Sequence, residues 1–107
     1  METDPFGYWA IYETEERVPP ATGVFCEEFS LGPLRAVTWS QAAQTWIFNP
    51  GPAARFLFDD QLQDRISQVT RAEAERIALD RFGVPLPSEE ELHRICEEGE
   101  QAAKASQ

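Results

Sequence analysis

The segment from residue 34 to residue 58 has the densest apolar and aromatic content of this 107-residue chain. Its β-branched and aromatic residues predict three strands, because such side chains suit the pleated surface of a sheet. A Pro50-Gly51 pair precedes the last of them, and proline followed by glycine suits the two central positions of a type II turn. We therefore expect the last two strands to form a β-hairpin. The three predicted strands are Leu34–Trp39, Thr45–Asn49 and Ala54–Phe58.

Two further strands are predicted nearer the N-terminus, at Tyr8–Glu13 and Val24–Leu31. Successive side chains of a strand point to opposite faces of the sheet. In the first strand, Trp9 and Ile11 therefore share one face, and Tyr8, Ala10 and Tyr12 share the other. The strands Thr45–Asn49 and Ala54–Phe58 are apolar on both faces, with Phe56 and Phe58 opposed to Leu57 in the latter, which is typical of central strands that are covered on both sides.

Two helices are predicted near the C-terminus, each introduced by a capping box, in which a hydroxyl accepts an amide proton and a Glu reaches back to the cap. Thr70 begins the first helix, which ends before Gly83. Ser88 begins the second, which frays within residues 101–107. Residues 65–69 fit either the end of a short helical turn or an edge strand. The inner sides of the two helices are predicted to be Ala74, Ile77, Ala78 and Phe82, and Leu92, Ile95, Cys96 and Gly99.

The order of these segments, strands followed by helices, is typical of the α+β class. We predict an antiparallel sheet of four to five strands followed by two C-terminal helices packed on one face. Residues 1–107 form a single domain with loose ends at residues 1–5 and 101–107, because no linker is long enough to separate two domains. The other face of the sheet is then expected to be curled on itself, partly open as a site, or buried in a homodimer.

The charge of the chain limits its partners. It has 19 acidic and 9 basic residues, for a net charge of -10. This charge disfavours nucleic-acid phosphates and anionic membrane surfaces, and it attracts basic proteins. No apolar run approaches the roughly 20 residues needed to span a bilayer, and the first residues do not resemble a secretory signal. We therefore predict a cytoplasmic protein that binds neither nucleic acid nor membrane.

The residues capable of chemistry match no common catalytic or metal-binding arrangement. His93 and Cys96 are one helical turn apart, but together with Cys26 they fall short of the four ligands of a structural zinc site. Two cysteines so far apart fit reduced, buried thiols better than a disulfide. No glycine-framed nucleophile and no phosphate-binding glycine loop is present. We expect no catalytic residue, no metal and no cofactor.

Glu27 is the one carboxylate with an unusual predicted setting. It alternates with Phe25 and Phe29 and therefore shares an apolar face with them. A carboxylate on such a face needs solvent or a cation, so we expect Glu27 to lie at a sheet edge or to pair with an arginine such as Arg35 or Arg55. A catalytic use would require a second carboxylate with a different pKa nearby.

These features favour a non-catalytic acidic module that binds a basic protein, for example as an inhibitor or an immunity-type protein. Electrostatic steering would speed its association. One alternative is a small-molecule binder or enzyme with an aromatic pocket on the sheet, and another is a structural or assembly subunit of an oligomer such as a homodimer. The predicted partner-binding residues are Tyr12, Glu13, Glu15, Glu16, Asp59 and Asp60, with Trp46 as an aromatic anchor.

Overall fold

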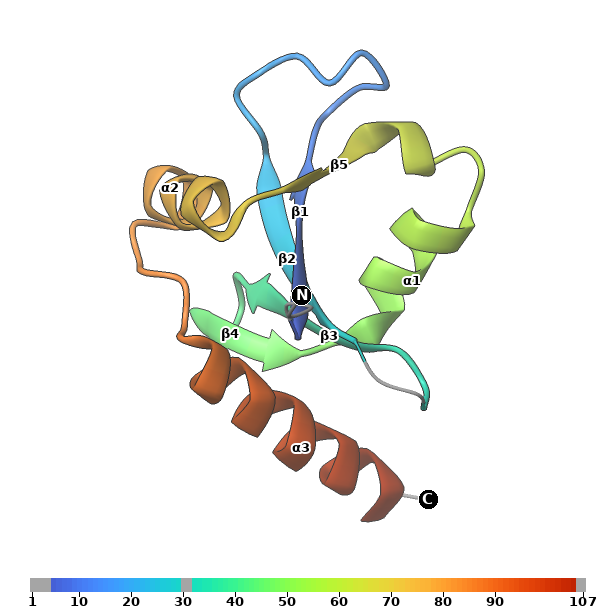
Figure 1. The fold of residues 1–107 in the computed structure, drawn as a ribbon, viewed down its shortest axis with the longest axis vertical. Coiled ribbons are helices and arrows are strands. Elements are labelled where there is room, and N and C mark those ends of the chain that lie inside the picture. Colours follow the sequence, from blue (N-terminus) through green and yellow to red (C-terminus); the bar gives the residue numbers. More distant parts are fainter. Residues whose placement is uncertain (1–4, 30–31, 106–107) are drawn as a thin grey trace.

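A computed structural model describes residues 5–29 and 32–105. The described chain forms a five-stranded sheet in the order β4-β3-β2-β1-β5, and every neighbouring pair is antiparallel (Figure 1). The strands are β1 (Phe6–Ile11), β2 (Gly23–Glu28), β3 (Arg35–Ser40), β4 (Thr45–Phe48) and β5 (Ile66–Val69). The helices are α1 (Pro50–Phe58), the short 3-10 helix η1 (Gln63–Arg65), α2 (Arg71–Phe82) and α3 (Glu89–Ala105).

The α+β class and the antiparallel sheet are as predicted, but the number of helices is not. Helix α1 occupies the segment for which the sequence predicted a hairpin turn and the strand Ala54–Phe58. Pro50 stands at the start of α1, where the missing N–H needs no acceptor. The preceding residue, Asn49, stands at the N-cap position and donates its N–H to the carbonyl of Ala36 at 2.9 Å. The proline-rich segment therefore starts a helix instead of closing a hairpin.

Helix α1 is held to the sheet by residues at helical spacing. Ala53, Phe56 and Leu57 are at positions i, i+3 and i+4, and all three belong to the apolar cluster on that side of the sheet. Phe58, which the strand prediction placed on the same face as Phe56, is instead exposed. The strand prediction was wrong because a short apolar run reads as either element, and here helical packing on the sheet decides.

The two faces of the sheet belong to two separate apolar clusters. Tyr8 and Ala10 of β1 join the cluster that contains the buried residues of α2 and α3. Trp9 and Ile11 join the cluster beneath α1. This alternation is the one predicted from the sequence. Figure 1 shows α1 and α2 on opposite sides of the sheet, so the face that the sequence analysis left uncovered carries a helix.

Residues 65–69, which the sequence left open between helix and strand, include strand β5. Ile66–Val69 pairs with β1 and forms one edge of the sheet. The available edge of β1 supplies the hydrogen-bond partners that a short segment cannot find locally. The predicted end of the second strand, Leu31, lies outside the described residues, and β2 itself ends at Glu28.

The predicted helix starts are confirmed. The Thr70 hydroxyl accepts the Glu73 N–H at 3.2 Å, and the Ser88 hydroxyl accepts the Glu91 N–H at 3.1 Å. Gly83 ends α2 in the left-handed conformation, with φ of 70°. One detail of the capping box differs, because the Glu73 carboxylate pairs with an arginine on its own helix instead of reaching back to the cap.

Helix α3 is tied to the sheet by the guanidinium of Arg35 on β3. Its Nη1 donates to Glu28 Oε1 at 2.9 Å, and its Nη2 donates to Glu97 Oε1 at 2.9 Å and to Glu100 Oε1 at 3.0 Å. Only 14% of the Arg35 side chain is exposed. Further along α3, Gly99 lies so close to Phe48 of β4 that an added Cβ would stand 2.3 Å from the Phe48 Cβ.

Candidate functional site

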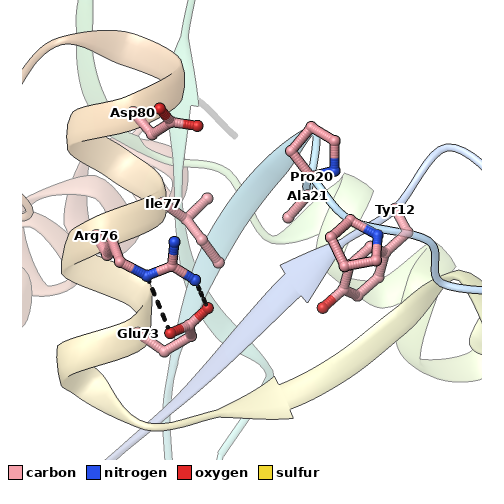
Figure 2. A pocket seen from close by; sticks show the side chains of 8 residues that line it. Tyr12, Pro20, Ala21, Glu73, Arg76, Ile77 and Asp80 are labelled. Atoms are coloured by element: carbon pink, nitrogen blue, oxygen red, sulfur yellow. Dashed lines mark hydrogen bonds and ion pairs between the residues drawn. The ribbon is translucent and has the colours of Figure 1, made fainter.

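A cleft opens between helix α2 and the loop that joins β1 to β2 (Figure 2). Its volume is about 330 Å³. Tyr12, at the start of the loop, and Ile77 of α2 face each other across it, and Pro20 and Ala21 form the loop side. We call this hollow the loop–α2 cleft.

The apolar part of the loop–α2 cleft continues into the protein core. Ala21 and Ile77 are 8% and 6% exposed, and both belong to the larger apolar cluster, with the Tyr12 ring packed against it. The loop is held at its base by the Thr22 N–H, which donates to the Ile11 carbonyl at 2.7 Å. The floor of the cleft is therefore held in place by packing against the core.

Three charged side chains of α2 line the rim of the cleft. Glu73 and Arg76 form an ion pair (Figure 2), and this hydrogen bonding raises the pKa of Arg76. Neither the Asp80 carboxylate nor the Tyr12 hydroxyl hydrogen-bonds to any of the described residues. The cleft thus offers the Asp80 carboxylate and the Tyr12 hydroxyl as hydrogen-bonding groups, beside the guanidinium of Arg76, which is already paired with Glu73.

Of the predicted contact residues of the first loop, only Tyr12 is part of this cleft. Tyr12 lines it, and Glu13, Glu15 and Glu16 follow directly in the exposed part of the loop. The next residue, Arg17, does not pair with these glutamates, because its Nε donates to the Asp64 carbonyl at 2.8 Å. The loop therefore presents carboxylates to solvent between Tyr12 and Pro19, two residues that line the cleft.

Asp59 and Asp60 do not belong to the loop–α2 cleft. They follow α1, on the other side of the sheet from α2, and both are exposed. Asp59 Oδ1 accepts the Gln61 N–H at 2.9 Å, so it shapes its own turn. The structure thus divides the predicted acidic contacts between two separate places.

Trp46, the predicted aromatic anchor, is only 9% exposed. Its ring packs edge-on against Trp39, with centroids 5.5 Å apart, and against Phe82 of α2, with centroids 5.7 Å apart. The ring is part of the core, and this burial removes it from the surface available to a partner.

The contribution of α2 to the cleft was missed in the sequence analysis. Glu73, Arg76, Ile77 and Asp80 are spaced i, i+3, i+4 and i+7, which places them on one side of a helix. That spacing was visible, but charged residues at such positions usually form a solvated helix face. Only the packing of Ile77 against the loop turns this side of α2 into the wall of a cleft.

Glu27 has a different environment from the one predicted. Strand β2 lies between β1 and β3, so Glu27 is not at a sheet edge. Arg35 pairs with the next residue, Glu28, and Glu27 Oε1 instead accepts the indole N–H of Trp9 at 3.4 Å. Burial raises the pKa of Glu27, and the hydrogen bond from Trp9 only partly opposes this.

No known family model matches the chain, and no curated protein or solved structure is significantly similar to it. In residues 5–29 and 32–105, no helix combines the length and apolar character needed to cross a membrane. The same residues hold no group of three or more His, Cys, Asp or Glu side chains arranged to bind a metal ion. The function has to be argued from the geometry of the surface.

Proposed function

We propose that this protein is a non-catalytic binding module that takes up a basic protein partner at the loop–α2 cleft. The observation that carries the proposal is the pairing of an apolar floor with two polar groups that have no hydrogen-bond partner among the described residues. Lysine and arginine side chains combine an apolar stem with a cationic end. The stem would lie along Ile77 and the Tyr12 ring, and the cation would reach the Asp80 carboxylate.

The surrounding charge supports a basic partner. Glu13, Glu15 and Glu16 are exposed in the loop that follows Tyr12. The arginines near Tyr12 are engaged within this chain, because Arg17 and Arg76 each pair with an acidic side chain and Arg65 donates to the Tyr12 carbonyl. Carboxylates gathered around a low-dielectric hollow raise the local concentration of cationic partners and speed their association. The net charge of -10 acts in the same direction. An inhibitor or immunity-type protein that covers a basic active site would need this combination.

The test is an affinity capture from the lysate of the native cell at low salt, eluted with a salt gradient and identified by mass spectrometry. Wild-type protein is compared with Asp80→Asn, which removes one charge in the cleft, and with Glu90→Gln, which removes one exposed charge on α3. We expect a basic protein that is retained by wild-type and by Glu90→Gln but released at lower salt by Asp80→Asn. The proposal fails if no basic protein is retained, or if both variants weaken its binding equally.

A further inference from the structure

Glu27 lies in a second hollow, on the α1 side of the sheet. The hollow has a volume of about 230 Å³ and is bordered by Phe29, Leu34 and Phe58. It sits at the opposite end of β1 and β2 from the loop–α2 cleft, because Glu27 pairs with Gly7 whereas Tyr12 follows the far end of β1. We call it the Glu27 pocket.

The sheet register explains why the Glu27 pocket exists. Glu27 is paired with Gly7 on β1 and with Ala36 on β3. Directly paired residues project to the same face of a sheet. The Glu27 side chain is therefore flanked on both sides by residues with little or no side chain, and the Phe29 ring can lie over Gly7 beside it.

Two aromatic rings stand exposed at this pocket. Phe29 is 47% exposed and Phe58 is 71% exposed, although large apolar side chains are normally buried in a core. The Phe29 ring lies over Gly7, since its Cζ is 2.7 Å from the place where a Cβ of residue 7 would stand. The rings and the carboxylate therefore line one hollow from three segments of the chain, namely β2, the residue after it and the end of α1.

The Glu27 carboxylate lacks a cation in the described part of the chain. Among the described residues, its one hydrogen bond is the long one from the Trp9 indole N–H to Oε1, and its Oε2 accepts nothing. Arg35 is occupied by Glu28, Glu97 and Glu100. A half-buried carboxylate without a cation lowers the free energy of unfolding, and such an arrangement is often kept because a ligand supplies the missing charge.

We propose that the Glu27 pocket binds the guanidinium group of an arginine side chain presented by a basic protein. The carboxylate accepts two hydrogen bonds from the planar cation, and the rings of Phe29 and Phe58 stack on its faces. Arginine is favoured over lysine because its flat, weakly hydrated head matches both a carboxylate and an aromatic face. The proposal concerns a different surface from the loop–α2 cleft and does not depend on it.

The indole N–H of Trp9 reports on this pocket, because it donates to the carboxylate that would receive the arginine. Two-dimensional ¹⁵N NMR resolves the indole signals of the three tryptophans, and Trp9→Phe assigns the relevant one. The probe is Nα-acetyl-arginine amide, which imitates an arginine inside a protein chain. We expect a saturable shift of the Trp9 signal, with a dissociation constant of roughly 1–10 mM for so small a probe.

The variants separate a specific pocket from general attraction to an acidic protein. Glu27→Gln and Phe58→Ala should weaken the binding of the arginine probe, the former by about tenfold or more. Glu90→Gln on α3 should leave it unchanged. Gly7→Ala should weaken it as well, because the new Cβ displaces the end of the Phe29 ring.

Three ligand controls complete the test. Nα-acetyl-citrulline amide, which is neutral and nearly isosteric, should not shift the Trp9 signal, and Nα-acetyl-lysine amide should bind several-fold more weakly. A shift that persists in Glu27→Gln, an equal response to lysine, or no saturable shift would overturn the proposal. Tighter binding of free L-arginine than of the blocked form would also overturn it, because the pocket would then suit a small molecule better than a protein side chain.

Discussion

Replacing Arg35 with methionine should destabilise the fold substantially, because the guanidinium holds three carboxylates at the junction of β3 and α3. The exposed fractions of the side chains are 14% for Arg35, 10% for Glu28 and 22% for Glu100. Removing one partner of a fully buried ion pair costs about 3–5 kcal/mol, since the remaining charge is left without compensation.

The cost should be smaller than for a fully buried ion pair, because this cluster is partly exposed. Glu97 is 42% exposed and can turn to solvent, and Glu28 keeps its contact with His93. We therefore expect Arg35→Met to lower the free energy of unfolding by about 2–3 kcal/mol. On a domain whose total stability is on the order of 5–15 kcal/mol, this change is easily measured by urea unfolding followed by tryptophan fluorescence.

Arg94→Met is the matched control. Arg94 is on the same helix and also pairs with glutamates, Glu91 and Glu98, but its side chain is 58% exposed. Exposed pairs of this kind contribute little to stability, because water and salt screen them. If the two variants lose stability equally, the reasoning from burial is refuted.

The pH dependence gives a second check on Arg35. The hydrogen bond from Arg35 lowers the pKa of Glu100. A carboxylate whose pKa is lower in the folded state contributes stability above its unfolded pKa, which is about 4.3, and loses that contribution as the pH falls through the folded value. The difference between wild-type and Arg35→Met should therefore be constant near neutral pH and shrink below about pH 4. A difference that stays constant down to pH 2 would contradict the assigned role of the carboxylates.

Three further predictions follow from close packing and burial. Gly99→Ala should lower the free energy of unfolding by about 1–3 kcal/mol in urea, because its Cβ would stand 2.3 Å from the Cβ of Phe48, which cannot rotate away. Glu27→Gln should make the protein more stable at pH 7, because burial raises the pKa of Glu27 and disfavours its charged form. The gain in stability should vanish on acidification, as Glu27 becomes protonated. An unchanged or lower stability of the variant at pH 7 would contradict this prediction. Burial raises the pKa of the Cys26 thiol to about 12 and that of Cys96 to about 11, so neither should react with iodoacetamide at pH 8 until the protein is unfolded in urea.

Features set by contacts within a few residues could be predicted from the sequence. The two helix starts depend on a hydroxyl and an amide three residues apart, and the structure has both bonds, at Thr70 and at Ser88. The division of β1 into two faces follows from the strand repeat alone, and Trp9 and Tyr8 indeed lie in different clusters.

Features that depend on competition between alternative elements could not be predicted from the sequence. Asn-Pro-Gly-Pro serves a turn and a helix start equally well, so the segment after Pro50 was decided by the fit of Phe56 and Leu57 against the sheet. The edge strand Ile66–Val69 likewise exists because β1 offers it a free edge. In both cases the local propensities are too weak to choose, and long-range packing selects the outcome.

The candidate sites show the same division. The acidic loop that begins at Tyr12 was identified from its composition, and it does border the loop–α2 cleft. The partner wall, with Asp80, could not be found from the sequence, because 68 positions separate it from Tyr12 and only the packing of α2 closes that distance. Trp46 was predicted to be an anchor at the surface, but in the structure Phe82 of α2 packs against its ring.

The amino-acid sequence by itself determined the α+β class, the caps of α2 and α3, the alternation along β1, and the excess of negative charge. These properties depend on residue type and on neighbours a few positions away, which the chain order specifies directly. The tertiary structure alone decided that residues 50–58 are helical and that Arg35 forms an ion pair with Glu28 and not with Glu27. It also decided that Glu27 lies between Gly7 and Ala36 in the sheet. The physical reason is that strand register and helix docking bring together residues far apart in the chain, and the free energy of that packing is not encoded in any short segment.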